Sequence, residues 1–420
     1  MTNSLLKKFI RNNAIVFILL NSAGLFSYIF QVVLGRTLPP DQYGSFNSLL
    51  ATGALITTPI TILHLVFSRF IARINVQKLQ HIKSLLTISL KFILCIALGI
   101  FLIGLSFSPW LKNFLNTETT LPIILMLLAA CFSSFQQIFI AVCEGMQRFL
   151  SLGMISGGGA LAKILFAILF VVILGWGVEG GLLALSFATF SALAYGIWQL
   201  QDVFKAQAVD LHSSSLMEMA RFSIPSFFMI TMVSIMCNID IVLARHYCPP
   251  DQAGYYATAT ILGRIAFFLP SSLLMVLFPS VAKATVSGSK DNHYLWVSLG
   301  LTFILSGGVF LVFFIAGQSI INLVYGDQYS SAAPMLIIVA AAMGLLAISH
   351  VIFSYNMARS EFSFLWFLFS GVILMLSLVF WYHDSAKMIA WVLLLSTATI
   401  FLGTILNRVY LSFPQSNLPN

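Results

Sequence analysis

The chain has 420 residues, of which 59% are hydrophobic and only 8% are charged, and its mean hydropathy is +0.98. A soluble domain carries about 25% charged residues because its surface faces water. The composition therefore excludes an ordinary soluble protein and predicts that much of the surface faces lipid. The formal net charge of +8 does not indicate nucleic-acid binding, because the basic residues do not form one cluster. The five cysteines form no C-x-x-C pair and no metal-ligand spacing, so we expect no metal site.

An apolar run from residue 14 to about residue 34 follows three basic residues. This run is too long for the hydrophobic region of a signal peptide, so we expect a retained first span. An α-helix needs about 20 apolar residues to cross the bilayer core. On this criterion the predicted spans are 14–34, 45–67, 85–107, 122–143, 154–175, 180–200, 221–243, 255–277, 295–317, 332–355, 363–381 and 387–406. The sequence thus predicts an all-α membrane protein with twelve transmembrane helices.

The basic residues are distributed unequally between the two sides of these spans. Four lie in the connections on the side opposite the N-terminus: Arg36, Lys112, Arg245 and Lys387. Fourteen lie on the N-terminal side: Lys7, Lys8, Arg11, Arg69, Arg73, Lys78, Lys83, Arg148, Lys205, Arg221, Lys283, Lys290, Arg359 and Arg408. Cytoplasmic loops carry an excess of Lys and Arg. We therefore expect both termini in the cytoplasm.

The sequence contains an internal repeat. Pro39-Pro40-Asp41-Gln42-Tyr43-Gly44 after the first span matches Pro249-Pro250-Asp251-Gln252-Ala253-Gly254 after the seventh, and Pro59 matches Pro270. We expect the two aspartates to cap the helices that follow. Because six spans separate the copies, both repeats have the same orientation, as in transporters with parallel repeats. We expect a six-helix lobe at 1–206, a cytoplasmic linker at 207–220, a second six-helix lobe at 221–420, and a central cleft that opens alternately to either side.

The order of several short segments resembles a known family, the polysaccharide flippases of the multidrug/oligosaccharidyl-lipid/polysaccharide exporter superfamily, specifically the O-antigen repeat-unit type. The segments are residues 34–44, 144–149, 221–225, 238–240, 253–256, 263–264, 278–279, 326–329 and 332–336. The resemblance implies a bacterial inner-membrane protein of polysaccharide (for example lipopolysaccharide) biosynthesis. Its substrate would be sugars on a polyprenyl pyrophosphate, moved from the cytoplasmic to the periplasmic leaflet. It also implies work beside a polysaccharide polymerase and glycosyltransferases. The lipid II flippases of the same superfamily usually carry extra helices, for which this chain has no room.

Ionisable residues inside the spans are the candidate site, because such residues are costly in lipid and usually face a cavity or a partner. Lys163 in span 5 and Arg264 in span 8 would bind the substrate pyrophosphate from the two lobes. Arg264 could instead form a structural ion pair with Asp240 of span 7. Asp240 is either such a partner or the site of a coupling ion, H⁺ or Na⁺. Lys91 is a further substrate candidate, although its side chain could reach the interface from span 3.

Other polar features stay open between two roles. Arg36 and Arg245, near the outer ends of spans 1 and 7, would guide the headgroup or anchor the helices at the interface. Residues 157–159 are three glycines one turn before Lys163, which permit close helix packing or leave volume for sugars. Ser27, Tyr28 and Gln31 give span 1 a polar face that could contact sugars or a neighbouring helix. His64 in span 2 carries no assigned role.

Two other functions compete with the flippase. A multidrug or organic-cation antiporter would have the same architecture but would hold carboxylates in its cleft, whereas Glu144 and Glu179 of the first lobe lie at helix ends. A membrane enzyme would need a large outer loop or a convergent set of acid, base or metal-binding groups. The sequence has neither, so we expect a transporter without a resident cofactor and not an enzyme.

Overall fold

The computed structural model describes residues 22–73, 79–207, 209, 213–271, 292–359 and 361–412, and every regular element among them is helical. Residues 22–37 form the first described helix. The following helices in the N-terminal part are α2 (Pro40–Arg73), α3 (Leu79–Ser106), α4 (Ser108–Phe114), α5 (Leu121–Gly145), α6 (Phe149–Gly153), α7 (Gly159–Ala167), α8 (Gly177–Gln199) and α9 (Gln201–Lys205). The later ones are α10 (Ser213–Tyr247), α11 (Pro250–Gly263), α12 (Ile265–Ser271), α14 (Asn292–Val324), α15 (Ala333–Ala358), α16 (Phe364–Trp381) and α17 (Ala386–Ser412).

Ten helical segments of the described residues are long and apolar enough to cross a membrane, which makes the chain a multi-pass membrane protein. They correspond in order to ten of the twelve predicted spans. Residues 14–21 of the first predicted span lie outside the described residues. The eighth predicted span, 255–277, is interrupted at Arg264 between α11 and α12, and its residues 272–277 also lie outside the description. The count of twelve therefore remains a prediction.

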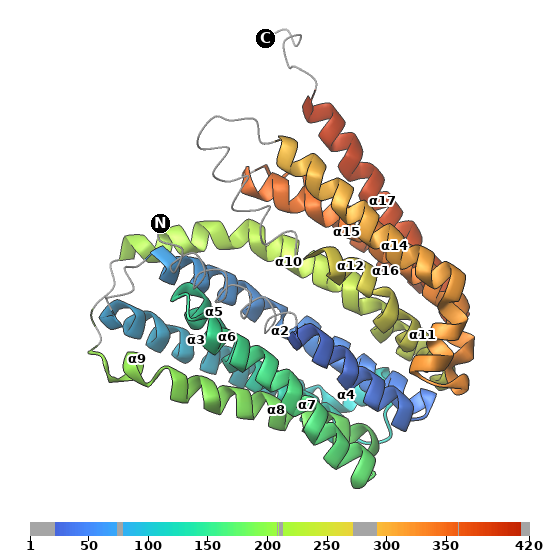
Figure 1. The fold of residues 1–420 in the computed structure, drawn as a ribbon, viewed down its shortest axis with the longest axis horizontal. Helices are drawn as coiled ribbons and strands as arrows, with labels where there is room; N and C mark the ends of the chain where they lie inside the picture. Colours follow the sequence, from blue (N-terminus) through green and yellow to red (C-terminus); the bar gives the residue numbers. More distant parts are fainter. Residues whose placement is uncertain are drawn as a thin grey trace, which may run out of the picture. The chain divides into compact units, whose positions relative to one another are not determined.

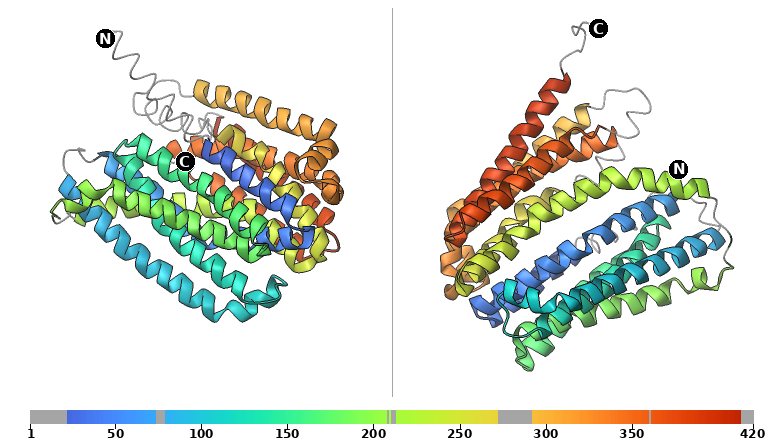
Figure 2. Two further views of the ribbon diagram at one scale, coloured as in Figure 1. Left: turned by 60° about the horizontal axis from the view of Figure 1, so that its bottom comes forward. Right: turned by 180° about the vertical axis from the view of Figure 1, so that it is seen from behind.

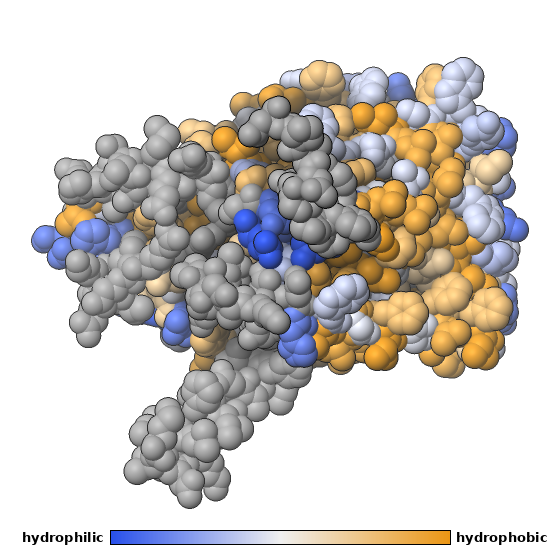
Figure 3. All heavy atoms as spheres, turned by 90° about the horizontal axis from the view of Figure 1, so that it is seen from above, coloured by the Kyte–Doolittle hydropathy of each residue, from blue (hydrophilic) through white to orange (hydrophobic). Residues whose placement is uncertain are grey.

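Large apolar side chains stand on the outside of the long helices. Ile315, Trp366 and Trp381 are 81%, 76% and 75% exposed. Figure 3 shows a face with a broad area of hydrophobic side chains and hydrophilic side chains at its right-hand edge. Such exposure is costly in water and favourable in hydrocarbon, so this surface is the one that lipid covers.

The chain divides into two compact units, Met1–Phe227 and Phe228–Asn420, which we call the N-terminal and C-terminal units. The division falls inside α10. In the N-terminal unit α5 is the central helix, because it packs against α2, α3 and α8, while α7 packs on α8. Figures 1 and 2 show α3, α5, α7 and α8 side by side. The buried residues between them include Ile82, Ile138 and Phe139.

The C-terminal unit is built in the same way around α15. This helix packs against α11, α12, α14 and α17, and α16 packs on α17 (Figure 1). Among the ten segments, Asp327–Ala358, which contains α15, has the largest buried share in its apolar stretch, 67%. Because α5 and α15 are the fourth predicted spans of their repeats, the same helix of each repeat is the core of its unit.

The repeat has a constant offset of 210 residues through its first loop, from Pro39 to Pro249. Both preceding helices end two residues before the first proline, at residues 37 and 247, and both loops close with an equivalent backbone bond, from Leu38 N to Leu34 O and from Cys248 N to Ala244 O. This register corrects one expectation. Asp251 lies inside the first turn of α11, whose N-cap is Pro249 without a side-chain cap. Asp41 likewise lies in the first turn of α2, where a carboxylate interacts favourably with the positive end of the helix dipole.

Candidate functional site

Lys163 lies on α7, a short stretch of regular helix between two π-helical segments. The preceding segment is η1 (Met154–Gly158) and the following one is η2 (Ile168–Ile173). In the glycine run, Gly159 packs against Ala192 of α8, since a Cβ on it would lie 3.1 Å from the Ala192 Cβ, whereas Gly158 faces open space. π-Helical turns are rare and occur frequently at functional sites. The fifth predicted span is therefore irregular on both sides of its only charged residue.

The Lys163 side chain contacts the first helix of the N-terminal unit. Its Nζ donates a hydrogen bond to Ser27 Oγ at 3.3 Å and lies 5.9 Å from the centroid of the Phe30 ring. The Ser27 hydroxyl itself donates to the Ala23 carbonyl at 2.8 Å. Among the described residues no carboxylate forms an ion pair with Lys163. The ammonium can therefore donate further hydrogen bonds to an anion.

Arg264 and Asp240 form a buried ion pair in the C-terminal unit. Arg264 Nη2 lies 3.3 Å from Asp240 Oδ1, and the two residues are 8% and 0% exposed. The other carboxylate oxygen, Oδ2, accepts a hydrogen bond of 3.1 Å from the Tyr256 hydroxyl. Arg264 itself stands at the break between α11 and α12. The structure thus contains the ion pair that the sequence left as one of two roles for these residues.

The side chains that Lys163 and Arg264 contact lie at equivalent positions of the internal repeat. With the offset of 210, Phe30 corresponds to Asp240 and Phe46 to Tyr256. The phenylalanines form an edge-to-face pair with centroids 6.0 Å apart, where the C-terminal unit has a hydrogen bond between phenol and carboxylate. Lys163 reaches Phe30 from the fifth predicted span, and Arg264 reaches Asp240 from the eighth. A basic side chain therefore meets an apolar ring in one unit and a carboxylate in the other.

The remaining candidate residues lie elsewhere. Lys91 is exposed on α3, and Arg36 is exposed at the end of the first helix. Arg245 is buried, with 6% exposure. In the register of the repeat Arg36 corresponds to His246, one residue after Arg245, so the two arginines face different directions around their helices. The structure brings none of these three into contact with Lys163 or Arg264 among the described residues.

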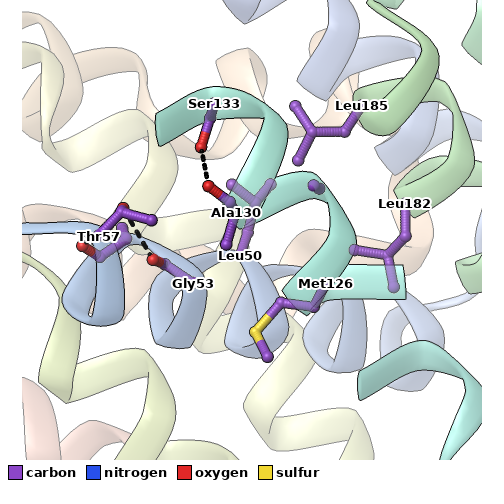
Figure 4. Close-up of a pocket in the computed structure, with 10 residues that line it drawn as sticks. Leu50, Gly53, Thr57, Met126, Ala130, Ser133, Leu182 and Leu185 are labelled. Atoms are coloured by element: carbon purple, nitrogen blue, oxygen red, sulfur yellow. Dashed lines mark hydrogen bonds between the residues drawn. The ribbon is translucent and has the colours of Figure 1, made fainter. Parts of the chain in front are cut away.

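A cavity of about 180 Å³ lies within the N-terminal unit, between α2, α5 and α8 (Figure 4). Its lining is mostly apolar and includes Ala54, Met126 and Leu182. Ala54 corresponds to Arg264 in the repeat, and the preceding residues, Gly53 and Gly263, are both glycines. The repeat position that is Arg264 in the C-terminal unit is therefore Ala54 in the N-terminal unit, where it lines an apolar cavity.

A hydrogen-bonded group that the sequence did not indicate joins α2 to α5. His64 Nδ1 lies 2.8 Å from Gln137 Oε1, and its Nε2 lies 2.8 Å from Glu144 Oε2. The side chains of His64 and Glu144 are 21% and 46% exposed. No spacing rule links residues 64 and 144, so this contact could be found only from the packing of the two helices.

An ion pair of the N-terminal unit lies beyond the ends of the spans. Arg148 Nη1 donates to Asp202 Oδ1 at 3.0 Å, and this hydrogen bond holds the pKa of Asp202 below its ordinary value of 3.8. In the C-terminal unit Arg359, 211 residues later, pairs with Glu361 at 2.8 Å. Arg148 thus joins the loop after α5 to α9, whereas Arg359 and Glu361 lie two residues apart in the loop after α15.

The helices, their apolar outer surface and the few interior charges define a multi-pass membrane protein of transporter architecture. Three solved structures share this fold. A multidrug resistance MATE family transporter of the MOP superfamily, in an inward-facing conformation, matches with a TM-score of 0.79 at 12% identity, over 94% of this chain and 98% of that one. The lipid II flippase MurJ matches with a TM-score of 0.69 at 12% identity, over 96% and 88%. The MATE multidrug transporter DinF-BH matches with 0.70 at 16%, over 96% and 95%.

The chain belongs to the polysaccharide biosynthesis protein family, whose model matches residues 10–285. Its fold is the one found in the MATE transporters and in the lipid II flippase described above. No curated protein matches the sequence well enough to serve as a relative.

Proposed function

We propose that the protein is a flippase that moves polyprenyl-pyrophosphate-linked oligosaccharide repeat units, of the O-antigen type, from the cytoplasmic to the periplasmic leaflet of a bacterial inner membrane. The mechanism is alternating access, with lobes at 1–206 and 221–420, a linker at 207–220 and both termini in the cytoplasm. The protein acts beside a polymerase and glycosyltransferases of polysaccharide biosynthesis and catalyses no covalent reaction itself. Family membership and the structural likeness to a lipid II flippase support this proposal.

The observation that carries the proposal is the environment of Lys163. The ammonium is half-buried against Ser27 and Phe30 without an ion pair in the described part of the chain. A cation held in a span without a carboxylate is costly unless it binds an anion. A pyrophosphate is such an anion, since Lys offers it a compact charge with three donors. Lys163 is therefore the principal phosphate contact in the proposal.

The other candidate residues have secondary roles. Arg264 is a second phosphate contact, and Asp240 is its partner and the acceptor of a coupling ion, H⁺ or Na⁺. Arg36, Arg245 and Lys91 contact the charged headgroup during entry or release. Ser27 and Gln31 offer hydrogen bonds to sugars near Lys163, and Gln31 already accepts one of 3.0 Å from Tyr43.

A multidrug or organic-cation antiporter is the second candidate function. The specific observation in its favour is the TM-score of 0.79 with a multidrug transporter, higher than the 0.69 with the flippase. The acidic residues of the N-terminal unit weigh against it. Those whose side chains are described lie at helix ends or in a loop, namely Asp41, Glu118, Glu144, Glu179 and Asp202. A cation would then meet Lys163 without a compensating carboxylate.

Deletion of the gene in its host tests the proposal, with analysis of the surface polysaccharide and of the polyprenyl-linked sugars. The flippase function predicts loss of the surface polymer and accumulation of repeat units on the cytoplasmic leaflet, both reversed by the intact gene. In a strain without any other flippase, an unchanged polymer together with altered sensitivity to cationic drugs would replace the flippase with the antiporter.

A further inference from the structure

The guanidinium of Arg264 uses few of its hydrogen-bond donors. An arginine has five N–H groups in a planar fork. Here one contact of 3.3 Å joins Nη2 to Asp240, and the Nε atom is buried without a hydrogen-bond partner. A buried donor without a partner is costly. The site can therefore form a better set of bonds with a ligand that offers more than one oxygen, such as a phosphate.

Asp240 occupies the place where such a ligand would bind Arg264. Its carboxylate is fully buried and receives one hydrogen bond from Arg264 and one from Tyr256. The repeat shows that the fold does not need an acid here, since Phe30 fills the same position in the N-terminal unit. The effect of Asp240 is therefore specific to the C-terminal unit. Asp240 neutralises Arg264, whereas its counterpart Phe30 cannot neutralise Lys163.

We infer that Asp240 is the proton-binding residue of transport, and that its proton decides whether Arg264 binds the protein's own carboxylate or the phosphate of the substrate. This inference rests on the proposed function and identifies how its substrate site is coupled to an ion. When Asp240 is ionised, Arg264 is neutralised by it. When a proton binds a carboxylate oxygen, the pair loses its negative member, and the buried guanidinium requires another anion. Binding of one anionic phosphate oxygen to Arg264 is thus accompanied by uptake of one proton on Asp240, and the phosphate oxygen takes over the neutralisation of the guanidinium.

The surroundings contain few other groups that could titrate in place of Asp240. On α10 the nearest are the Cys237 thiol, about one turn before it, and Arg245, five residues after it. Tyr256 faces it from α11. From α15, His350 stacks on Phe267 of α12 with centroids 5.3 Å apart. In the described part of the C-terminal unit, no second carboxylate contacts Arg264.

Equilibrium binding of geranylgeranyl pyrophosphate to the detergent-purified full chain tests the inference, measured between pH 5 and pH 8. For the wild type we expect affinity to rise as the pH falls. Asp240→Asn imitates the protonated acid, so we expect about tenfold tighter binding at pH 8 and no pH dependence beyond that of the ligand itself. Arg264→Gln should bind weakly throughout, alone or with Asp240→Asn. Asp251→Asn, at an exposed acid in the first turn of α11, is the matched control and should follow the wild type.

A second measurement does not depend on the folding of a variant. Calorimetry of the wild type at pH 8, in buffers of different ionisation enthalpy, should show uptake of about one proton per bound ligand, since the pyrophosphate is already ionised at that pH. Binding without proton uptake would overturn the inference and leave the flippase function standing. So would an Asp240→Asn protein that melts like the wild type but binds no more tightly. Failure of the wild type to bind the pyrophosphate at any pH, with binding of rhodamine 6G instead, would overturn the proposed function and the inference together.

Discussion

Phe30 and Asp240 occupy the same position of an internal repeat, and a basic side chain reaches each of them from a different helix. Lys163 lies 5.9 Å from the Phe30 ring, and Arg264 lies 3.3 Å from the Asp240 carboxylate. The two units thus share a framework but differ in charge at one position. In the proposed function, Lys163 binds the anionic substrate without competition from a carboxylate. Binding by Arg264 depends on whether Asp240 carries a proton.

Removal of the Lys163 ammonium should impair transport without impairing folding. We expect Lys163→Ala to lower surface polymer in a complemented deletion strain at least about tenfold, because a charge-assisted hydrogen bond to phosphate is lost. Lys112→Ala, on the short helix α4 of the same unit, should restore the polymer fully. Immunoblots of the tagged protein check abundance. If the polymer falls only in proportion to the amount of protein, Lys163 has a structural role.

Introduction of a carboxylate at Phe30 should copy the arrangement of the C-terminal unit into the N-terminal unit. We expect Phe30→Asp to abolish transport, because the new acid would neutralise Lys163. Phe30→Asn has nearly the same shape without the charge, and Phe30→Leu keeps the position apolar. Polymer levels should therefore follow the order Leu, Asn, Asp from highest to lowest. Equal defects in the Asn and Asp variants would show that packing, and not charge, determines the effect.

Gly263 should be required for the packing of α11 on α15. A Cβ at this position would lie 2.7 Å from Val339 Cγ1 and 3.2 Å from the Ala340 nitrogen. We expect Gly263→Ala to destabilise the protein by about 1–3 kcal/mol, measured as a lower melting temperature in detergent. Gly308→Ala on α14, where nothing lies within 4 Å of the added atom, is the control. A melting temperature unchanged in both variants would contradict the close approach.

The ion pair between Arg148 and Asp202 should stabilise the protein only where Asp202 is ionised. The pKa of Asp202 is below its ordinary value of 3.8 because of the hydrogen bond from Arg148. Its contribution is therefore complete above that value and is lost as the pH falls through the lower pKa of the folded protein. The Asp202 side chain is 43% exposed, so we expect Asp202→Asn to lower the melting temperature at pH 7 by at most about 3 °C. The difference from wild type should shrink steadily below about pH 4, and a difference that grows there would refute the sign.

The cytoplasmic placement of both termini can be measured with reporter fusions. A green fluorescent protein at the C-terminus should fluoresce, and alkaline phosphatase at the same place should be inactive. Alkaline phosphatase fused after Thr117, between α4 and α5, should be active, because this loop lies on the opposite side in the predicted topology. The reverse pattern of activities would invert the orientation.

The class of the protein and most of its spans can be predicted from the amino-acid sequence alone. Apolar runs of about 20 residues can be satisfied in lipid only as helices, so ten predicted spans overlap the observed helical segments over most of their length. The repeated P-P-D-Q-x-G motif also indicated the duplication. These features are local, and each depends on residues close to one another in the chain.

Which side chains contact one another, in contrast, depends on the packing of the helices. Arg36 and Arg245 precede the two motifs and look equivalent in the sequence. The ends of the two helices show that they differ by one position in the register of the repeat, and Arg36 is exposed whereas Arg245 is buried. The contacts of Lys163 with Phe30 and of His64 with Glu144 join residues 133 and 80 positions apart in the chain. Such contacts depend on how each helix is rotated against its neighbour, a rotation that the packing of many side chains sets together and that no short pattern records.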